Sequence, residues 1–240
     1  MVTEIAGHGT AEARWQAWPE MSGWPRLKLD PAIPPLVVAP HPDDEILGVA
    51  GLMAMLGAAD LVAVTDGEAS HPGSTVHRPD ELAAIRRAET TEALRRLGLG
   101  AATEHRLGQP DGGIDEDALT CALIGLLRPG RWCLTTWRGD GHPDHEAVGR
   151  AAARACRATD ARLLEYPIWA WHWAYPEDPR VPWARARRID LTPTAMAAKA
   201  AAIAAFPSQI AALGPAEADA AILPPHVLAR FSRPFEVVFA

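Results

Sequence analysis

The feature that most constrains the fold of this chain is a regular alternation of short apolar runs with longer helical patterns. Five runs have the composition of buried strands, and they lie at residues 35–39, 60–65, 103–107, 132–136 and 162–166. The intervals between them carry helical patterns, over residues 46–57, 80–97, 115–127 and 145–158. This alternation predicts an α/β fold, a Rossmann-like three-layer sandwich whose mostly parallel central sheet is covered by helices on both faces.

The length of the chain favours one domain. With 240 residues and 48% hydrophobic content, the chain can bury a single sizeable core. We expect residues 1–240 to form one domain, with an N-terminal extension over 1–30, a core over 31–166 and a capping and C-terminal region over 167–240. A short helix through 196–206 and a final strand over 235–239 are expected in the last region.

The charge and cysteine content exclude several classes of partner. A formal net charge of -7 without a block of Lys or Arg argues against nucleic acid, and a small-molecule substrate is expected instead. The three cysteines show no C-x-x-C spacing, which is typical of thiols in a reducing, cytoplasmic setting. No run reaches the roughly 18–20 apolar residues of a membrane span, and the first residues do not resemble a secretory leader. The sequence leaves open whether the chain forms a homo-oligomer.

Two clusters of histidines and acids follow the first and fourth expected strands. The first is HPDDE at 41–45 and the second is GHPDH at 141–145. In the common strand order 3-2-1-4-5 these two strands are neighbours whose outgoing loops diverge at a topological switch point, where α/β proteins bind ligands. The two clusters are therefore expected to meet in one crevice.

The residue types in these clusters suit a hydrolytic metal site, which takes three protein ligands and leaves a position for water. His41, Asp44 and His145 form a set that fits Zn²⁺, and Fe²⁺ or Co²⁺ would fit it too. Asp43 and His142 are then left beside the metal, where amide hydrolysis needs a base and a donor for the oxyanion. The structural alternative for Asp43 is a helix N-cap.

The two clusters resemble a known family. HPDDE, followed later by GHPDH, is similar to the motifs of the LmbE-like or PIG-L family of zinc-dependent N-deacetylases, which act on N-acetylglucosaminyl conjugates. The resemblance extends through IRRAETTEALRRLG at 85–98 and RLGQPDGGI at 106–114, and it covers residues 35–166. It implies that His41, Asp44 and His145 bind zinc and that Asp43 is the general base.

The resemblance also assigns roles around these ligands. It implies that His142 stabilises the oxyanion or protonates the leaving amine, with Asp144 as a candidate to orient it. Arg86 matches a substrate-binding arginine, and Asp111 matches an acid near the sugar. Solvated ion pairs on a helix and a simple turn are the respective structural alternatives for these two residues. Some family members have a Tyr where this chain has Asp140, so another group must take over that tyrosine's part in polarising the carbonyl.

Several further segments carry weaker expectations. The acids of DGE at 66–68 are interpreted as solvated loop residues. Strand alternation in WAWHW at 169–173 would place its three tryptophans on one face, in the core or at the substrate rim. His172 would then lie on the opposite face, where contact with the site is one alternative. The Lys199, Ser208 and Gln209 pattern resembles relatives and is interpreted as packing. The tryptophans of the extension, Trp15, Trp18 and Trp24, indicate a segment wrapped on the domain or lying at a subunit contact.

The sequence therefore favours a zinc-dependent hydrolase that removes the N-acetyl group from an amino-sugar conjugate. An amidase that cleaves a larger acyl group from a sugar or thiol conjugate would use the same centre. A non-catalytic sugar-binding module is the alternative from another class, although the presence of Asp43 beside all three ligands argues against it. A nucleotide-binding Rossmann enzyme is disfavoured because no G-x-G-x-x-G follows the first expected strand.

Overall fold

The computed structural model describes residues 5, 7–29 and 33–240. Within them, seven strands form one sheet in the order β3-β2-β1-β4-β5-β7-β6. The first five strands of this order pair in parallel, and β7 pairs antiparallel with both of its neighbours. The strands are β1 (Leu36–Ala39), β2 (Asp60–Ala63), β3 (Glu104–Arg106), β4 (Trp132–Thr136), β5 (Arg162–Tyr166), β6 (Ala186–Asp190) and β7 (Phe235–Phe239).

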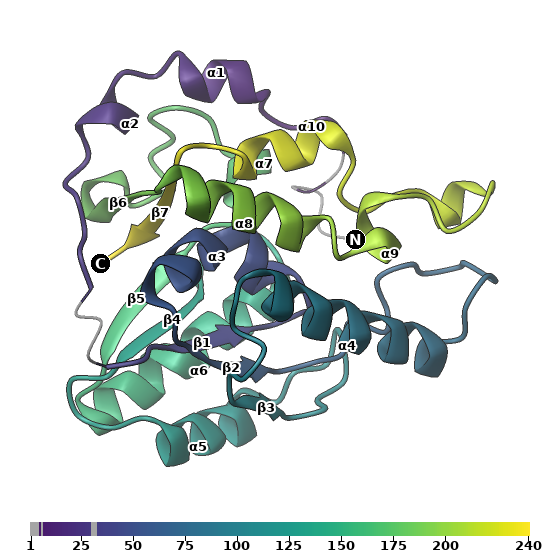
Figure 1. Ribbon diagram of the computed structural model, residues 1–240, viewed down its shortest axis with the longest axis horizontal. Coiled ribbons are helices and arrows are strands. Elements are labelled where there is room, and N and C mark those ends of the chain that lie inside the picture. Colours follow the sequence, from purple (N-terminus) through teal and green to yellow (C-terminus); the bar gives the residue numbers. More distant parts are fainter. Residues whose placement is uncertain (1–4, 6, 30–32) are drawn as a thin grey trace.

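Helices cover both faces of the sheet, as Figure 1 shows, with α5 and α6 below it and α3, α4 and α8 above it. The α-helices are α1 (Glu12–Gln16), α2 (Glu20–Gly23), α3 (Asp44–Leu56), α4 (Pro79–Arg96), α5 (Glu116–Leu126), α6 (Pro143–Thr159), α7 (Ala170–Trp173), α8 (Pro193–Ile203), α9 (Pro207–Ile210) and α10 (Pro225–Leu228). Short 3-10 turns lie at η1 (Trp183–Arg185), η2 (Glu217–Asp219) and η3 (Ala229–Phe231). Among the described residues, no helix combines the length and apolarity that a bilayer crossing requires.

The alternation of side chains along β1 explains the two apolar layers. Val37 and Ala39 belong to the larger core cluster, on the side of α3, whereas Leu36 and Val38 belong to the cluster that also contains residues of α5 and α6. All four side chains are buried, because a central parallel strand has helices on both of its faces. The predicted fold class and the order of the first five strands are therefore confirmed.

The structure differs locally from what the sequence indicated. The WAWHW segment does not form a strand: α7 occupies it, and only Trp171 of its three tryptophans is buried. His172 is buried with its Nδ1 3.1 Å from Arg230, and its carbonyl accepts from Thr10, so it faces the N-terminal segment. β6 was not expected, because its sequence ARRID lacks an apolar run.

The N-terminal extension packs on the antiparallel edge of the sheet. The Trp15 ring is fully buried and makes edge contacts with Trp171 and Trp183. A parallel β-bridge joins Arg26 to Arg188 of β6. Of the two arrangements that the sequence left open, residues 7–29 show the segment packed on the domain. The remainder of residues 1–30 lies outside the described residues except for residue 5.

Candidate metal centre

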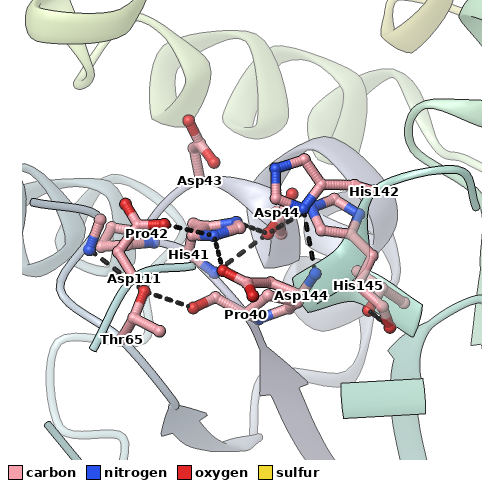
Figure 2. A network of polar contacts seen from close by, with 12 residues as sticks. Pro40, His41, Pro42, Asp43, Asp44, Thr65, Asp111, His142, Asp144 and His145 are labelled. Carbon is pink, nitrogen blue, oxygen red and sulfur yellow. Dashed lines mark hydrogen bonds and ion pairs between the residues drawn. The ribbon is translucent and has the colours of Figure 1, made fainter. Parts of the chain in front are cut away.

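The two motifs meet at the carboxyl ends of β1 and β4. The residues of the first motif occupy the β1–α3 loop and the first turn of α3, and those of the second lie at the start of α6. β1 and β4 are hydrogen-bonded neighbours. The loops that follow these two strands therefore begin side by side at the carboxyl ends of the strands. Figure 2 shows the resulting cluster, with the rings of His41, His142 and His145 grouped around the Asp44 carboxylate.

The Asp44 carboxylate lies at the spacing of a metal ligand from each of two imidazoles. Asp44 Oδ2 lies 3.2 Å from His41 Nδ1 and 3.3 Å from His145 Nε2. Zinc bonds of about 2.0–2.1 Å at tetrahedral angles would separate two ligand atoms by about 3.3 Å. His145 Nε2 is buried and has no hydrogen-bond partner, although it faces a carboxylate oxygen. The donor set and its spacing fit a divalent ion such as Zn²⁺.

The titration properties of the cluster also favour a cation. Burial lowers the pKa of His41, yet its contacts with Asp111, Asp144 and Asp44 outweigh burial and raise this pKa well above the usual value. Burial likewise lowers the pKa of His145, but Asp44 and Asp140 raise it to about 9. Burial alone would raise the pKa of Asp44, whereas His145 and His41 hold it well below its usual range. The surplus of carboxylates around two imidazoles would be offset by a bound positive ion.

Asp140 fixes the orientation of His145. Its Oδ2 lies 2.8 Å from His145 Nδ1 and also accepts from the backbone N–H of Trp169. Its Oδ1 accepts from the N–H groups of Ile168 and Ala170. A carboxylate that holds the second nitrogen of a metal-binding histidine sets its tautomer and raises its basicity. Asp140 therefore supports His145, and both of its carboxylate oxygens are engaged within the protein.

Two other carboxylates support His41 in the same way. His41 Nε2 lies 3.1 Å from Asp144 Oδ2 and 3.3 Å from Asp111 Oδ1. Among the described residues, two groups of three have ligand atoms that all lie within 4.8 Å of one another. One group is His41, His142 and His145, and the other is His41, Asp111 and Asp144. We interpret Asp111 and Asp144 as outer partners, because they approach the nitrogen of His41 that points away from Asp44. Each also accepts a backbone N–H, from Ala69 and Gly112 respectively.

His142 caps α6 and keeps one nitrogen available. Its Nδ1 accepts from the backbone N–H of Asp144, so the proton of the neutral ring lies on Nε2. Burial and then the nearby charges of His145 and His41 lower the pKa of His142 to about 3. A neutral ring with a free N–H is suited to donate to a developing oxyanion. The Asp144 carboxylate, which was expected to orient His142, instead contacts His41.

Asp43 adopts a strained backbone and lies beside an arginine. Its φ of 118° is in the left-handed region, which non-glycine residues rarely adopt outside constrained sites. Asp43 occupies the N-cap position of α3, as the structural alternative expected, but its side chain makes no capping hydrogen bond. The carboxylate extends away from the His41 ring (Figure 2), and its Oδ2 lies 3.2 Å from Arg86 Nη2. Burial raises the pKa of Asp43 to about 7, although Arg86 opposes the rise.

Arg86 is an interior residue of the site. It is 2% exposed, which excludes the solvated ion-pair interpretation. Its Nη1 donates to the carbonyl of Gly67 and its Nη2 to the carbonyl of Pro42. Gly67 has a φ of 67°, and a Cβ there would lie 2.1 Å from Arg86 Nη1. A glycine is therefore required at this position if α4 is to bring Arg86 against the motif loop.

Two further acids, Glu45 and Glu68, make contacts at the site that the sequence did not indicate. Glu45 is fully buried, its Oε2 accepts from the N–H of Asp43, and burial raises its pKa to about 8. Glu68 Oε1 accepts from the N–H of Asp111, so this acid of the DGE segment is not a simple solvated residue. Asp66 of the same segment pairs with Arg87 and Arg106. No periodicity reveals such roles, because each depends on a contact between segments.

A pocket of about 340 Å³ adjoins the cluster at Asp111. Its lining includes Glu68, His71 and His77 from the segment between β2 and α4, and Leu213 from the C-terminal region. Asp111 belongs both to this lining and to the contacts of His41.

The chain is similar to several known proteins. It is 32% identical over 148 residues to 1D-myo-inositol 2-acetamido-2-deoxy-alpha-D-glucopyranoside deacetylase 2 of Saccharopolyspora erythraea, and this match covers 48% of the chain and 53% of that relative. The chain thus spans about half the length of this curated relative. Its fold resembles the conserved protein TT1542 from Thermus thermophilus, with a TM-score of 0.56, 28% identity and coverage of 74% of this chain and 80% of that one.

The fold is also shared with N,N'-diacetylchitobiose deacetylase from Pyrococcus horikoshii, with a TM-score of 0.55, 22% identity and coverage of 71% of this chain and 68% of that one. The family model described as PIG-L, GlcNAc-PI de-N-acetylase, matches residues 36–156 of the 240. This match spans HPDDE and GHPDH together with Arg86 and Asp111, and it confirms the family resemblance seen in the sequence. The chain belongs to the PIG-L, GlcNAc-PI de-N-acetylase, family.

Proposed function

We propose that this protein is a zinc-dependent N-deacetylase that releases acetate and a free amine from an N-acetylglucosaminyl conjugate. The observation that carries the proposal is the contact of Asp44 Oδ2 with one nitrogen of His41, at 3.2 Å, and one of His145, at 3.3 Å, with the buried acid Asp43 on the neighbouring residue. Membership of the PIG-L family and the similarity to an inositol-linked acetamido-sugar deacetylase support it.

The chemistry follows from the placement of these side chains. When bound at His41, Asp44 and His145, Zn²⁺ would lower the pKa of a water and polarise the acetamide carbonyl. Asp43 accepts the proton of the attacking water, and Arg86 holds its carboxylate in place. His142 donates its Nε2 proton towards the developing oxyanion. Collapse to acetate requires a proton on the departing amine, which Asp43 or His142 supplies.

The substrate is proposed to lie between the metal centre and the pocket beside Asp111. Arg86 and Asp111 are the proposed substrate-binding residues, with the conjugated group in the pocket. The Arg86 guanidinium also makes the contacts with Gly67, Pro42 and Asp43, so any effect it has on a substrate is combined with its effect on the base. We further propose a single domain over residues 1–240 and a cytoplasmic setting, which the three free thiols support.

The experiment that tests the proposal is an amine-release screen on protein loaded with one equivalent of zinc. N-acetylglucosamine derivatives with different groups at the anomeric carbon form one arm, and the same sugars with longer N-acyl chains form the other. We expect acetyl substrates to be cleaved and a chelator to abolish turnover, with zinc restoring it. Preference for longer acyl chains would establish the amidase alternative, and full activity in metal-free protein would refute the proposed chemistry. Stoichiometric zinc without amine release from any substrate would favour a binding module.

A further inference from the structure

Helix α3, which begins at Asp44, is interrupted one turn later. Val49 has φ -140° and ψ 17°, which is not helical, and the helix continues beyond it to Leu56. In a regular α-helix the N–H of Gly51 would donate to the carbonyl of Leu47. Here the Leu47 carbonyl accepts from Lys199 Nζ at 2.8 Å, and the Gly51 N–H donates to Glu236 Oε1 at 2.8 Å.

The two side chains that take over these backbone groups also bind each other. Lys199 of α8 and Glu236 of β7 form an ion pair of 2.7 Å. Glu236 Oε2 accepts in addition from the N–H of Leu52, at 2.9 Å. The Lys199–Glu236 pair is therefore inserted into the hydrogen-bond ladder of α3 at its break, and it satisfies backbone groups on both sides of Val49.

Burial of this ion pair carries a large desolvation free energy. Lys199 is 4% exposed and Glu236 is 3% exposed, so both charges have lost their hydration. Well-packed apolar residues of similar volume often stabilise a fold at least as well as a buried ion pair does. What apolar residues could not supply is a donor for the Leu47 carbonyl and acceptors for two N–H groups. The pair therefore defines the geometry of the break, and with it the direction of the first turn of α3.

We infer that the Lys199–Glu236 pair is a positioning device for the metal centre. Leu47, whose carbonyl Lys199 holds, lies three residues after Asp44 in the same first turn. This turn presents Asp44 to His41 and His145 and follows directly on the strained Asp43. A shift of the turn would move Asp44 Oδ2 away from the two imidazole nitrogens. The inference rests on the proposed function in one respect, namely that Asp44 is a metal ligand.

The test compares zinc affinity in Lys199→Met and Glu236→Gln with that of the unaltered protein, measured by competition with a chromophoric chelator. Lys199→Met keeps the length of the side chain and removes the donor, whereas Glu236→Gln keeps the shape and leaves one acceptor for two N–H groups. Loss of a partner that orients a metal ligand typically costs about 10–100-fold in metal affinity or activity. We expect a loss of about 10-fold in zinc affinity in each variant, with kcat falling more than KM changes.

Arg131 provides the matched control. It is a buried basic residue that also donates to backbone carbonyls, those of Pro34 and Leu126, and pairs with the Asp60 carboxylate. Arg131 lies just before β4 begins, and Asp60 is the first residue of β2. The pair is therefore at the amino ends of the strands, whereas the metal centre is at their carboxyl ends. Arg131→Met is expected to lower the unfolding temperature while leaving zinc affinity within about 2-fold. If Lys199→Met lowers the unfolding temperature but not zinc affinity, the pair is purely structural and the inference fails.

A measurement on the unaltered protein covers the case in which the variants do not fold. Coupling between two sites is reciprocal, so zinc binding must stabilise the break if the break positions the ligand. We expect zinc to slow amide hydrogen exchange at Gly51 and Leu52 more than at the amides of α5. Equal effects in both helices would overturn the inference. If the unaltered protein binds no zinc at all, it is the proposed function that fails, and the two failures are thus distinguishable.

Discussion

Asp43 and Asp44 are adjacent in the first motif, but their carboxylates contact different side chains. Asp44 contacts two imidazoles at ligand spacing, whereas Asp43 contacts Arg86. We expect Asp43→Asn to retain zinc but lose about 10²–10⁴ in kcat, because its amide cannot accept the proton of water. Asp44→Ala should lose zinc and activity together. Metal analysis and kinetics on the same preparations check both, and the assignment is reversed if it is Asp43→Asn that empties the site.

Asp140 permits a separate prediction at the same scale. It holds His145 Nδ1, and its replacement by Asn removes the charge that raises the basicity of this ring. We expect Asp140→Asn to lower zinc affinity or kcat by about 10–100-fold. The control is Asp178→Asn, because Asp178 is also fully buried and accepts a backbone N–H, that of Arg180, without contacting the cluster. Similar losses of zinc affinity in both variants would mean that Asp140 acts only through general stability.

At the scale of elements, α3 packs against β5 through a glycine. A Cβ on Gly48 would lie 2.3 Å from the Tyr166 ring, which is fully buried. Overpacking of this kind costs about 1–3 kcal/mol, so Gly48→Ala should lower the free energy of unfolding by that amount. Gly125→Ala in α5 is the control: nothing lies within 4 Å of its Cβ position, and Ala there should stabilise the helix by about 0.5–1 kcal/mol. Urea unfolding of both variants tests the pair. If Gly48→Ala were as stable as the unaltered protein, α3 would be able to shift away from Tyr166 without loss of stability.

At the scale of the whole molecule, the N-terminal extension covers the antiparallel edge of the sheet. Trp15 is fully buried between Trp171 and Trp183, and its Nε1 donates to the carbonyl of Trp171. Removal of a buried Trp side chain costs about 3–5 kcal/mol, and we expect Trp15→Ala to destabilise the protein by this amount in urea unfolding. Trp132→Ala, at a half-buried position on β4, should cost clearly less. Equal losses would show that the extension contributes no more than an ordinary surface contact.

The sequence by itself determined the alternation of strands and helices and the two motifs at the ends of the first and fourth strands. Both are local: apolar runs specify strands, and HPDDE and GHPDH each carry their donors within five consecutive residues. Only the tertiary structure decided what each donor contacts. Asp140 supports His145 because the segment from Ile168 to Ala170 returns to it from the end of β5. The α7 helix replaced the expected strand in the same segment, since the backbone N–H groups at its start are satisfied by Asp140.

The same distinction explains the supporting acids and the break in α3. Glu68, Glu236 and Lys199 have no periodic pattern that reveals their role, because their partners lie on other elements. A buried charge finds its partner through the packing of those elements, and side chains far apart in sequence become neighbours only once the sheet and its covering helices have formed. The sequence thus predicts which residue types are available for catalysis and metal binding. The orientation and contacts of those residues depend on the tertiary structure.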